Sequence, residues 1–262
     1  MGRTLFMIHG MWGTPSVWEN WSGWFSDRGW RCMTPALRYH DMHPEEEPDP
    51  RLGQVGLTDY VRDLEQEIRA LPERPVVMGH SMGGLLAQKL AARGLARRAV
   101  LLTPAAPAGI MALRWSVVRS FLSYFARWGF WKKPHRITFA EASYSSLFLL
   151  DEQEQRRVYE TFVYESGRAI FETGLWLLDR RRAAAVPEGP LPCPALVVAA
   201  GRDRIVPAPV VRKTAERYGE SARYLELPHH AHWVHGEEGW QDICARVAAW
   251  LEDKSVGEEE DT

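Results

Sequence analysis

Short apolar runs alternate along the chain with longer segments in which apolar residues recur at helical spacing. The runs are three to five residues long, and such uninterrupted apolar stretches are typical of strands buried on both faces. They occupy residues 5–8, 76–78, 99–102 and 195–199, and the partly polar segments 31–34 and 224–227 are also predicted to be strands. Helical spacing covers residues 17–25, 58–71, 85–92, 209–218 and 238–252. Strands that alternate with helices predict an α/β fold with a doubly wound, mostly parallel sheet of about six strands.

Residues 58–71 illustrate the helical signal. Thr58 stands where a side-chain cap is favoured, and apolar residues follow at Val61, Leu64 and Ile68. The preceding residues 38–57 contain several prolines and glycines, together with three consecutive glutamates, which predicts a surface loop.

The alternation stops between residues 108 and 188. This stretch is rich in aromatic residues and helical in pattern, and no strand pair is needed to explain it. We expect a helical cap over 108–188, inserted between strands of a core formed by 1–107 and 189–253. Residues 254–262 are acidic and without pattern, and a disordered tail is expected there.

Composition narrows the class of protein. The chain has 262 residues, 45% of them hydrophobic, which is enough to bury a core without metals or disulfides. Its three cysteines are far apart and odd in number, so the sequence does not predict a disulfide framework. A net charge of −2 argues against a nucleic-acid partner. No apolar run is long enough to span a membrane and no signal peptide is visible, so a cytoplasmic location is expected.

The clearest chemical signal is Gly79-His80-Ser81-Met82-Gly83, which matches G-x-S-x-G. An apolar strand precedes it and a helix follows it, and this context gives the motif its meaning. A sharp strand-to-helix turn would lift the Ser81 hydroxyl above the sheet. Ser81 is therefore the predicted nucleophile.

A serine hydroxyl needs a base beside it and an acid to orient that base. Both should follow later strands, because catalytic groups gather at the carboxyl ends of a parallel sheet. Asp203 follows the strand at 195–199 and is the predicted acid. After the last strand, four histidines could supply the base: His229, His230, His232 and His235.

An oxyanion hole requires two backbone N–H donors, for which we expect Met82 and Met11. His9, beside the second of these, is predicted to brace the loop. Metal binding is the alternative for the histidine cluster, and for His40, Asp41 and His43. Neither group has regular ligand spacing, so no metal and no cofactor are predicted.

The sequence resembles the α/β-hydrolase superfamily from Thr4 to Leu251. The resemblance rests on the segments FMIHGMWG, VVMGHSMGG, LLTPAAPAG, VVAAGRDRIVP and HAHWV. It implies His232 as the base, since members of the superfamily place the histidine before an aromatic residue; alanine replaces the usual glycine at Ala231. His230 is the fallback. The resemblance also implies that the first two strands of larger members are missing, and serine at position 81 counts against dehalogenases and epoxide hydrolases.

These motifs predict an esterase-like or lipase-like hydrolase of small-molecule esters. The residues with an expected role at the substrate are Trp12, His80, Phe125, Trp128 and Glu165. Aromatic cap residues would favour a hydrophobic ester, although they could instead form the core of the cap. An exposed aromatic face would suit a lipid surface or a homodimer through the cap. The alternative functions are a lyase, an acyltransferase, a cofactor-free peroxidase and a catalytically silent binding protein.

Overall fold

The computed structural model describes residues 3–111 and 114–253, and the side chain of Phe125 is also outside the described part. The tail predicted at 254–262 lies beyond these residues. Six strands form one sheet in the order β2-β1-β3-β4-β7-β8, and every neighbouring pair is parallel. The strands are β1 Thr4–Ile8, β2 Arg31–Met33, β3 Val76–His80, β4 Arg98–Leu102, β7 Ala195–Ala200 and β8 Ala222–Leu227. The predicted α/β fold is confirmed.

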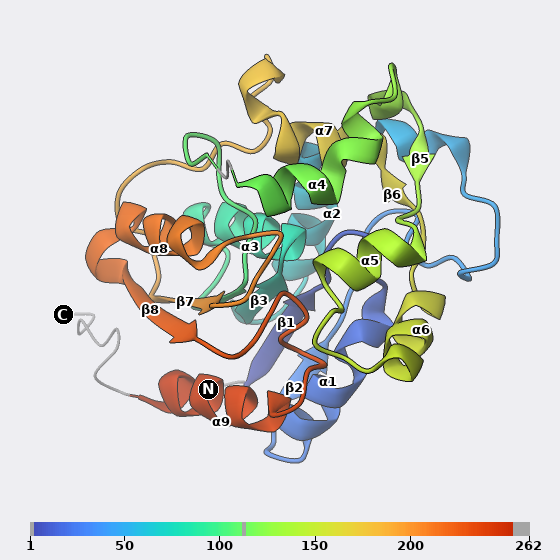
Figure 1. Cartoon of the computed structure of the whole chain (residues 1–262). Coiled ribbons are helices and arrows are strands. Elements are labelled where there is room, and N and C mark those ends of the chain that lie inside the picture. The colour runs from blue at the N-terminus through green and yellow to red at the C-terminus, as the bar shows by residue number, and fades with distance from the viewer. Residues whose placement is uncertain (1–2, 112–113, 254–262) are drawn as a thin grey trace.

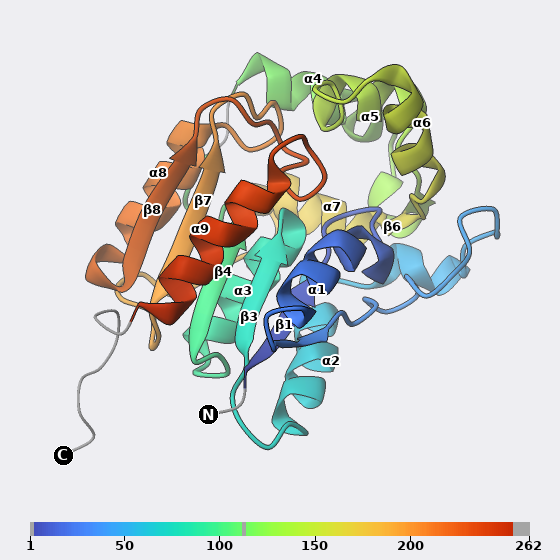
Figure 2. The same ribbon diagram turned by 90° about the horizontal axis from the view of Figure 1, so that it is seen from below.

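Helices cover both faces of the sheet (Figure 1; Figure 2). On one face, α1 Glu19–Ser26 and α9 Trp240–Glu252 pack against a cluster that includes Leu5 and Met7. The other face carries α2 Leu57–Arg69, α3 Met82–Ala92 and α8 Ala208–Arg217. Phe6 and Ile8 point toward that second cluster. Because successive strand residues face opposite helix layers, the strand reads as a continuous apolar run.

The start of α2 differs from the prediction. The helix begins at Leu57, with Gly56 rather than Thr58 at the N-cap position. The Gly56 N–H donates to the carboxylate of Asp59 at 3.0 Å, which satisfies one of the donors at the helix start. The loop before it also contains a short 3-10 turn at Pro50–Gln54.

The chain between β4 and β7 forms four α-helices and lies over the carboxyl ends of the strands (Figure 2). They are α4 Trp115–Phe125, α5 Phe139–Ser145, α6 Glu152–Glu160 and α7 Gly167–Gly174. Sequence analysis required no strands here, yet β5 Pro134–His135 and β6 Glu165–Ser166 pair in antiparallel fashion. Two residues are too few to produce a readable alternation.

Four further 3-10 turns complete the described chain: Pro15–Trp18, Phe130–Lys132, Trp176–Leu178 and Gly219–Ser221. None of the helices within the described ranges has both the length and the apolar character needed to cross a bilayer.

Candidate active site

Ser81 occupies a strained turn between β3 and α3. Its backbone has φ 53° and ψ −119°, which residues with a side chain rarely adopt. Close packing forces the turn: a Cβ on Gly79 would lie 2.1 Å from the carbonyl oxygen of Gly83, and one on Gly83 would lie 2.2 Å from that of Ile8. Only glycine fits at these two positions, which explains the residues flanking Ser81 in the motif.

His232 and Asp203 are buried and bonded to each other. The Nδ1 of His232 lies 2.7 Å from Oδ2 of Asp203. The other carboxylate oxygen accepts hydrogen bonds from the backbone N–H groups of Ile205 and Val206, at 2.7 and 2.8 Å. The carboxylate is thus held from both sides and can fix the imidazole tautomer that carries its proton on Nδ1. That tautomer leaves a lone pair on Nε2.

The hydroxyl of Ser81 and the imidazole of His232 belong to the same small cavity. In the described part of the chain no hydrogen bond joins the two side chains. Contacts of this kind often shorten only when substrate is bound. The candidate nucleophile and the candidate base therefore line the same cavity, but they are not hydrogen-bonded to each other in this structure.

Among the described residues, none of the other three histidines near His232 forms a hydrogen bond or ion pair with the Asp203 carboxylate. Nδ1 of His230 lies 3.1 Å from the carboxylate of Glu237 instead, and His229 is exposed. His235 is buried, and neither of its ring nitrogens has a hydrogen-bond partner among the described residues. The choice of His232 over His230 is thus the one compatible with the bonding of Asp203.

Glu237 holds the loop that carries His232, and sequence reasoning missed it. Its buried carboxylate accepts from the backbone N–H groups of Ala231 and Trp233, at 2.9 and 3.1 Å. The two donors flank His232, so the carboxylate fixes the backbone on both sides of the imidazole. No signal in the sequence distinguishes this residue from the exposed acid beside it.

The two residues expected to supply oxyanion donors both line the cavity next to Ser81. Met82 is the first residue of α3, where N–H groups lack intrahelical partners, and Met11 lies across the cavity from it. The Met11 loop is braced by His9: Nδ1–H donates to the Gly10 carbonyl at 2.9 Å, and Nε2 accepts from the Leu37 N–H at 3.1 Å. Burial, with a smaller effect of His40, lowers the pKa of His9 to about 3, so this brace is neutral.

Two further neutral imidazoles, His80 and His235, lie beside the segment that carries His232. His80 donates from Nε2 to the carbonyl oxygen of His232 at 2.8 Å, and its ring lies 4.3 Å from that of His235. Burial lowers the pKa of His80 well below 6.5 and that of His235 to about 3. Neither ring takes up a proton near neutral pH.

Replacing His235 with phenylalanine should weaken the acid sensitivity of the fold. At pH 5 the unfolded imidazole is protonated and the buried one is not, so stability falls as pH drops below about 6.5. Between pH 7.5 and pH 5, we expect the free energy of unfolding of wild type to fall by about 2 kcal/mol more than that of the variant, because of this one imidazole. Urea unfolding at both pH values measures it, with the same substitution at exposed His229 as control. Equal losses in wild type and variant would contradict the buried neutral state.

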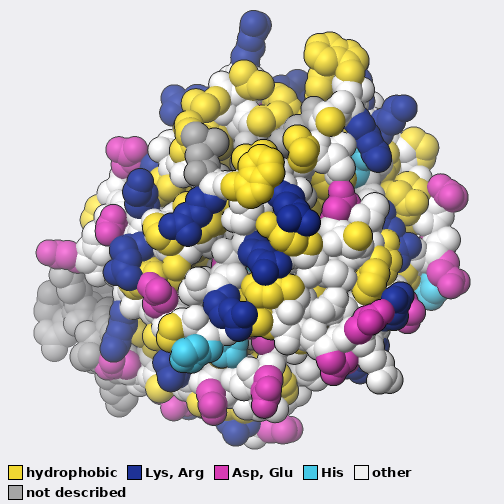
Figure 3. Space-filling model, in the orientation of Figure 1, with side chains coloured by type: hydrophobic (Ala, Val, Ile, Leu, Met, Phe, Trp, Pro, Cys, Tyr) yellow, Lys and Arg dark blue, Asp and Glu magenta, His cyan; other side chains and the backbone are white. Residues whose placement is uncertain are grey.

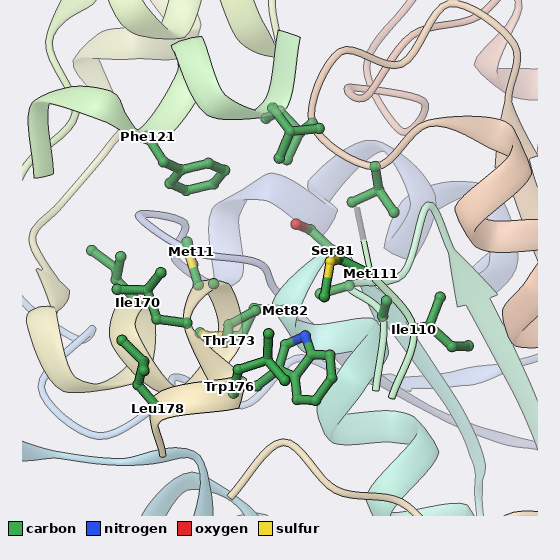
Figure 4. Close-up of a pocket in the computed structure, with 18 residues that line it drawn as sticks. Met11, Ser81, Met82, Ile110, Met111, Phe121, Ile170, Thr173, Trp176 and Leu178 are labelled. Carbon is green, nitrogen blue, oxygen red and sulfur yellow. The ribbon is translucent and has the colours of Figure 1, made fainter. Parts of the chain in front are cut away.

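A larger cavity of about 370 Å³ opens beside Ser81 (Figure 4). The sheet side contributes Met82, while α4, α7 and the turn after α7 close the opposite side. Ser81 and Thr173 are the only hydroxyl-bearing residues in its otherwise apolar wall, which also contains Ala105, Ile110, Met111, Phe121, Ile170, Trp176 and Leu178. Such a lining favours a hydrophobic ligand portion next to the serine.

The residues expected at the substrate fall into two groups. Trp12 and His80 line the small cavity with Ser81 and His232. Trp12 is anchored by its indole N–H, which donates to the His135 carbonyl at 3.1 Å. The expectation for Phe125 concerns a side chain outside the described part.

Trp128 and Glu165 do not line either cavity. Trp128 is 95% exposed, because it follows the end of α4 and points into solvent. Glu165 is fully buried elsewhere, 3.2 Å from Nε2 of His40 and 2.7 Å from the hydroxyl of Tyr60. Burial lowers the pKa of His40, but the carboxylate outweighs it and the net pKa is raised. Glu165 thus joins β6 to the core instead of facing the substrate.

The histidine and acid groups weighed as metal ligands do not converge. Among residues 3–111 and 114–253, no three His, Cys, Asp or Glu side chains are arranged to hold a metal ion.

Comparison with known proteins places this site in context. The sequence profile described as the alpha/beta hydrolase family matches residues 5–246. Among curated proteins no sequence matches the chain. Similar solved structures include a methylesterase from Arabidopsis, with 13% identity, TM-score 0.69, and coverage of 95% of this chain and 98% of the other.

Two further structures are similar to the same degree. A pyrethroid hydrolase from Sphingobium faniae has 14% identity and TM-score 0.70, covering 97% of this chain and 99% of the other. A monoacylglycerol lipase from Paleococcus ferrophilus has 16% identity and TM-score 0.67, covering 95% and 93%. At these identities the likeness extends to the fold alone.

Proposed function

The chain belongs to the alpha/beta hydrolase family, and on that premise we propose that it is a serine hydrolase that cleaves carboxylic esters with a hydrophobic acyl group. The observation that carries the proposal is the 2.7 Å bond between Asp203 and His232, at a cavity shared with Ser81. A buried, oriented imidazole beside a serine in a strained turn is the arrangement that activates a hydroxyl.

The reaction proceeds in two halves. Nε2 of His232 takes the hydroxyl proton as Oγ of Ser81 attacks the ester carbonyl, and the backbone N–H groups of Met11 and Met82 bind the resulting oxyanion. The carbonyl re-forms, the ester C–O bond breaks, and His232 passes its proton to the leaving alkoxide. Water then attacks the acyl-enzyme with the same imidazole as base, which releases the acid and restores Ser81. Asp203 stabilises the imidazolium in both halves and stays ionised.

The apolar cavity supports the choice of substrate class. Its wall beyond Ser81 offers almost no polar partner, so a charged or strongly polar acyl group would lose hydration without compensation. An alkyl or aryl acyl group gains free energy there by leaving water. The smaller cavity, which Ser81 also lines, can accommodate the alcohol portion.

A series of p-nitrophenyl esters of increasing acyl length tests the proposal. Each buried methylene contributes about 0.8 kcal/mol, so kcat/KM should rise about fourfold per methylene until the cavity is full. Thr173→Phe, which places a ring into the cavity, should lower kcat/KM for octanoate far more than for acetate. Absence of hydrolysis for every ester would overturn the proposed activity, whereas equal rates along the series would overturn only the hydrophobic preference.

A further inference from the structure

The segment between β4 and β7 carries an apolar surface that the fold does not use. Seven large hydrophobic side chains are at least 36% exposed in the described residues, and all lie in this segment. They form what we call the cap face: Met111, Trp115, Val118, Leu122, Trp128, Leu177 and Leu178. Soluble proteins rarely leave so many large apolar groups together in solvent unless they bind something there.

Helix α4 is apolar on two sides, and only one of them serves the cavity. Val117 and Phe121, one turn apart, line the cavity wall. Trp115, Val118 and Leu122 form a separate stripe and remain 73%, 36% and 52% exposed. The outer stripe therefore contributes neither to the core nor to the substrate cavity.

Three residues of the cap face also line the cavity. Met111, Leu177 and Leu178 line the cavity and are also exposed, at 44%, 65% and 68%. Met111, before α4, lies beside Ser81, whereas Leu178, after α7, lies on a different part of the cavity wall (Figure 4). A surface that bound the cap face would meet the entrance to the candidate active site.

Positive charge accompanies these apolar groups. Residues 108–133 and 173–187 contain eight lysines and arginines and one acid, the buried Asp179, although the whole chain has a net charge of −2. The eight cations are Arg114, Arg119, Arg127, Lys132, Lys133, Arg180, Arg181 and Arg182. None of them takes part in an ion pair with another described residue. Figure 3 shows Lys and Arg flanking hydrophobic side chains over α4.

We propose that the cap face docks on an anionic lipid surface. In the docked orientation the cavity entrance faces that surface. Exposed tryptophan and leucine can enter the headgroup region while the cations bind anionic headgroups. A second copy of the chain fits less well, because two like-charged faces would meet. Docking is a binding event that needs no chemistry at Ser81, so it stands or falls separately from the proposed function.

Vesicle co-sedimentation of the full chain tests the docking. We expect binding to phosphatidylcholine vesicles that contain about 30% phosphatidylglycerol, weak binding to phosphatidylcholine alone, and release in about 0.5 M NaCl. The double variant Trp115→Ser/Leu122→Ser should bind the anionic vesicles at least about tenfold more weakly. Its hydrolysis of a soluble ester should be unchanged, because neither side chain lines a cavity. Arg62→Ser/Arg69→Ser on α2 is the control for charge elsewhere and should bind like wild type.

Three results would overturn the docking proposal. One is failure of the wild-type chain to bind anionic vesicles. Another is equal binding by wild type and the Trp115/Leu122 variant. The third is a dimer in light scattering that the variant converts to monomer while neither protein binds vesicles, which would assign the cap face to a second copy. Ester hydrolysis could persist in all three cases, so the proposed function would be unaffected.

Discussion

Replacing Ser81 with alanine is expected to lower kcat for ester hydrolysis by about 10⁶-fold, to the residual rate that oxyanion donors and binding supply without a nucleophile. The hydroxyl is the only group at this turn that can form the acyl-enzyme, and the N–H groups of Met11 and Met82 cannot replace it. Initial rates on p-nitrophenyl butyrate, measured with enough enzyme to detect slow turnover, give the ratio.

Two controls distinguish loss of chemistry from loss of fold. Ser146→Ala changes another serine of the same small cavity, whose hydroxyl bonds the Ala142 carbonyl at 3.3 Å, and should retain activity within a few-fold. A fluorophosphonate probe should label wild type and Ser146→Ala but not Ser81→Ala, while near-ultraviolet circular dichroism stays the same in all three. Hydrolysis by Ser81→Ala at the wild-type rate would refute the mechanism.

Asp203→Asn is expected to reduce kcat by about 10⁴-fold with little change in structure. The amide oxygen can still accept from the N–H groups of Ile205 and Val206. Its NH₂ group then faces Nδ1 of His232, which must become an acceptor, so the imidazole proton moves to Nε2. The nitrogen that should take the Ser81 proton is thereby occupied.

A matched variant tests this interpretation. Glu237→Gln alters the other buried carboxylate near His232 but leaves the Asp203 bond in place, so it should cost much less activity than Asp203→Asn. Equal effects would mean that both residues merely support the loop. Retention of more than about a tenth of the wild-type rate by Asp203→Asn would show that another group orients the imidazole.

Local pattern was sufficient for the sheet and for the strand-to-helix turn that carries Ser81. Strand residues such as Leu5 and Phe6 are buried on both faces, and this leaves an apolar run that can be read directly. Ser81 was readable because its neighbours Gly79 and Gly83 are demanded by backbone contacts within a few residues or with the adjacent strand. Asp203 followed from its position after a strand.

Contacts across the chain could not be read in this way. Glu165 pairs with His40, 125 residues away, and nothing local separates a buried acid from a solvated one. Thr58 is a residue type that favours the N-cap position, but the Leu57 N–H donates to the carboxylate of Glu172 of α7 at 2.7 Å, which allows the N-cap to lie two residues earlier, at Gly56. The apolar residues of α4 predict a helix, but their spacing does not indicate which of the two stripes faces the cavity.

The parallel pairing of β4 with β7, where Ala99 meets Ala195, has a consequence for folding. The proposed nucleophile and oxyanion donors follow β3 and β1, whereas the proposed acid and base follow β7 and β8. The two parts of the site come together only when β4 pairs with β7. This pairing closes a loop of more than ninety residues, which is slow because of its entropic cost. Recovery of turnover during refolding should thus lag behind the return of helical signal, reporting the moment when the two halves of the sheet join.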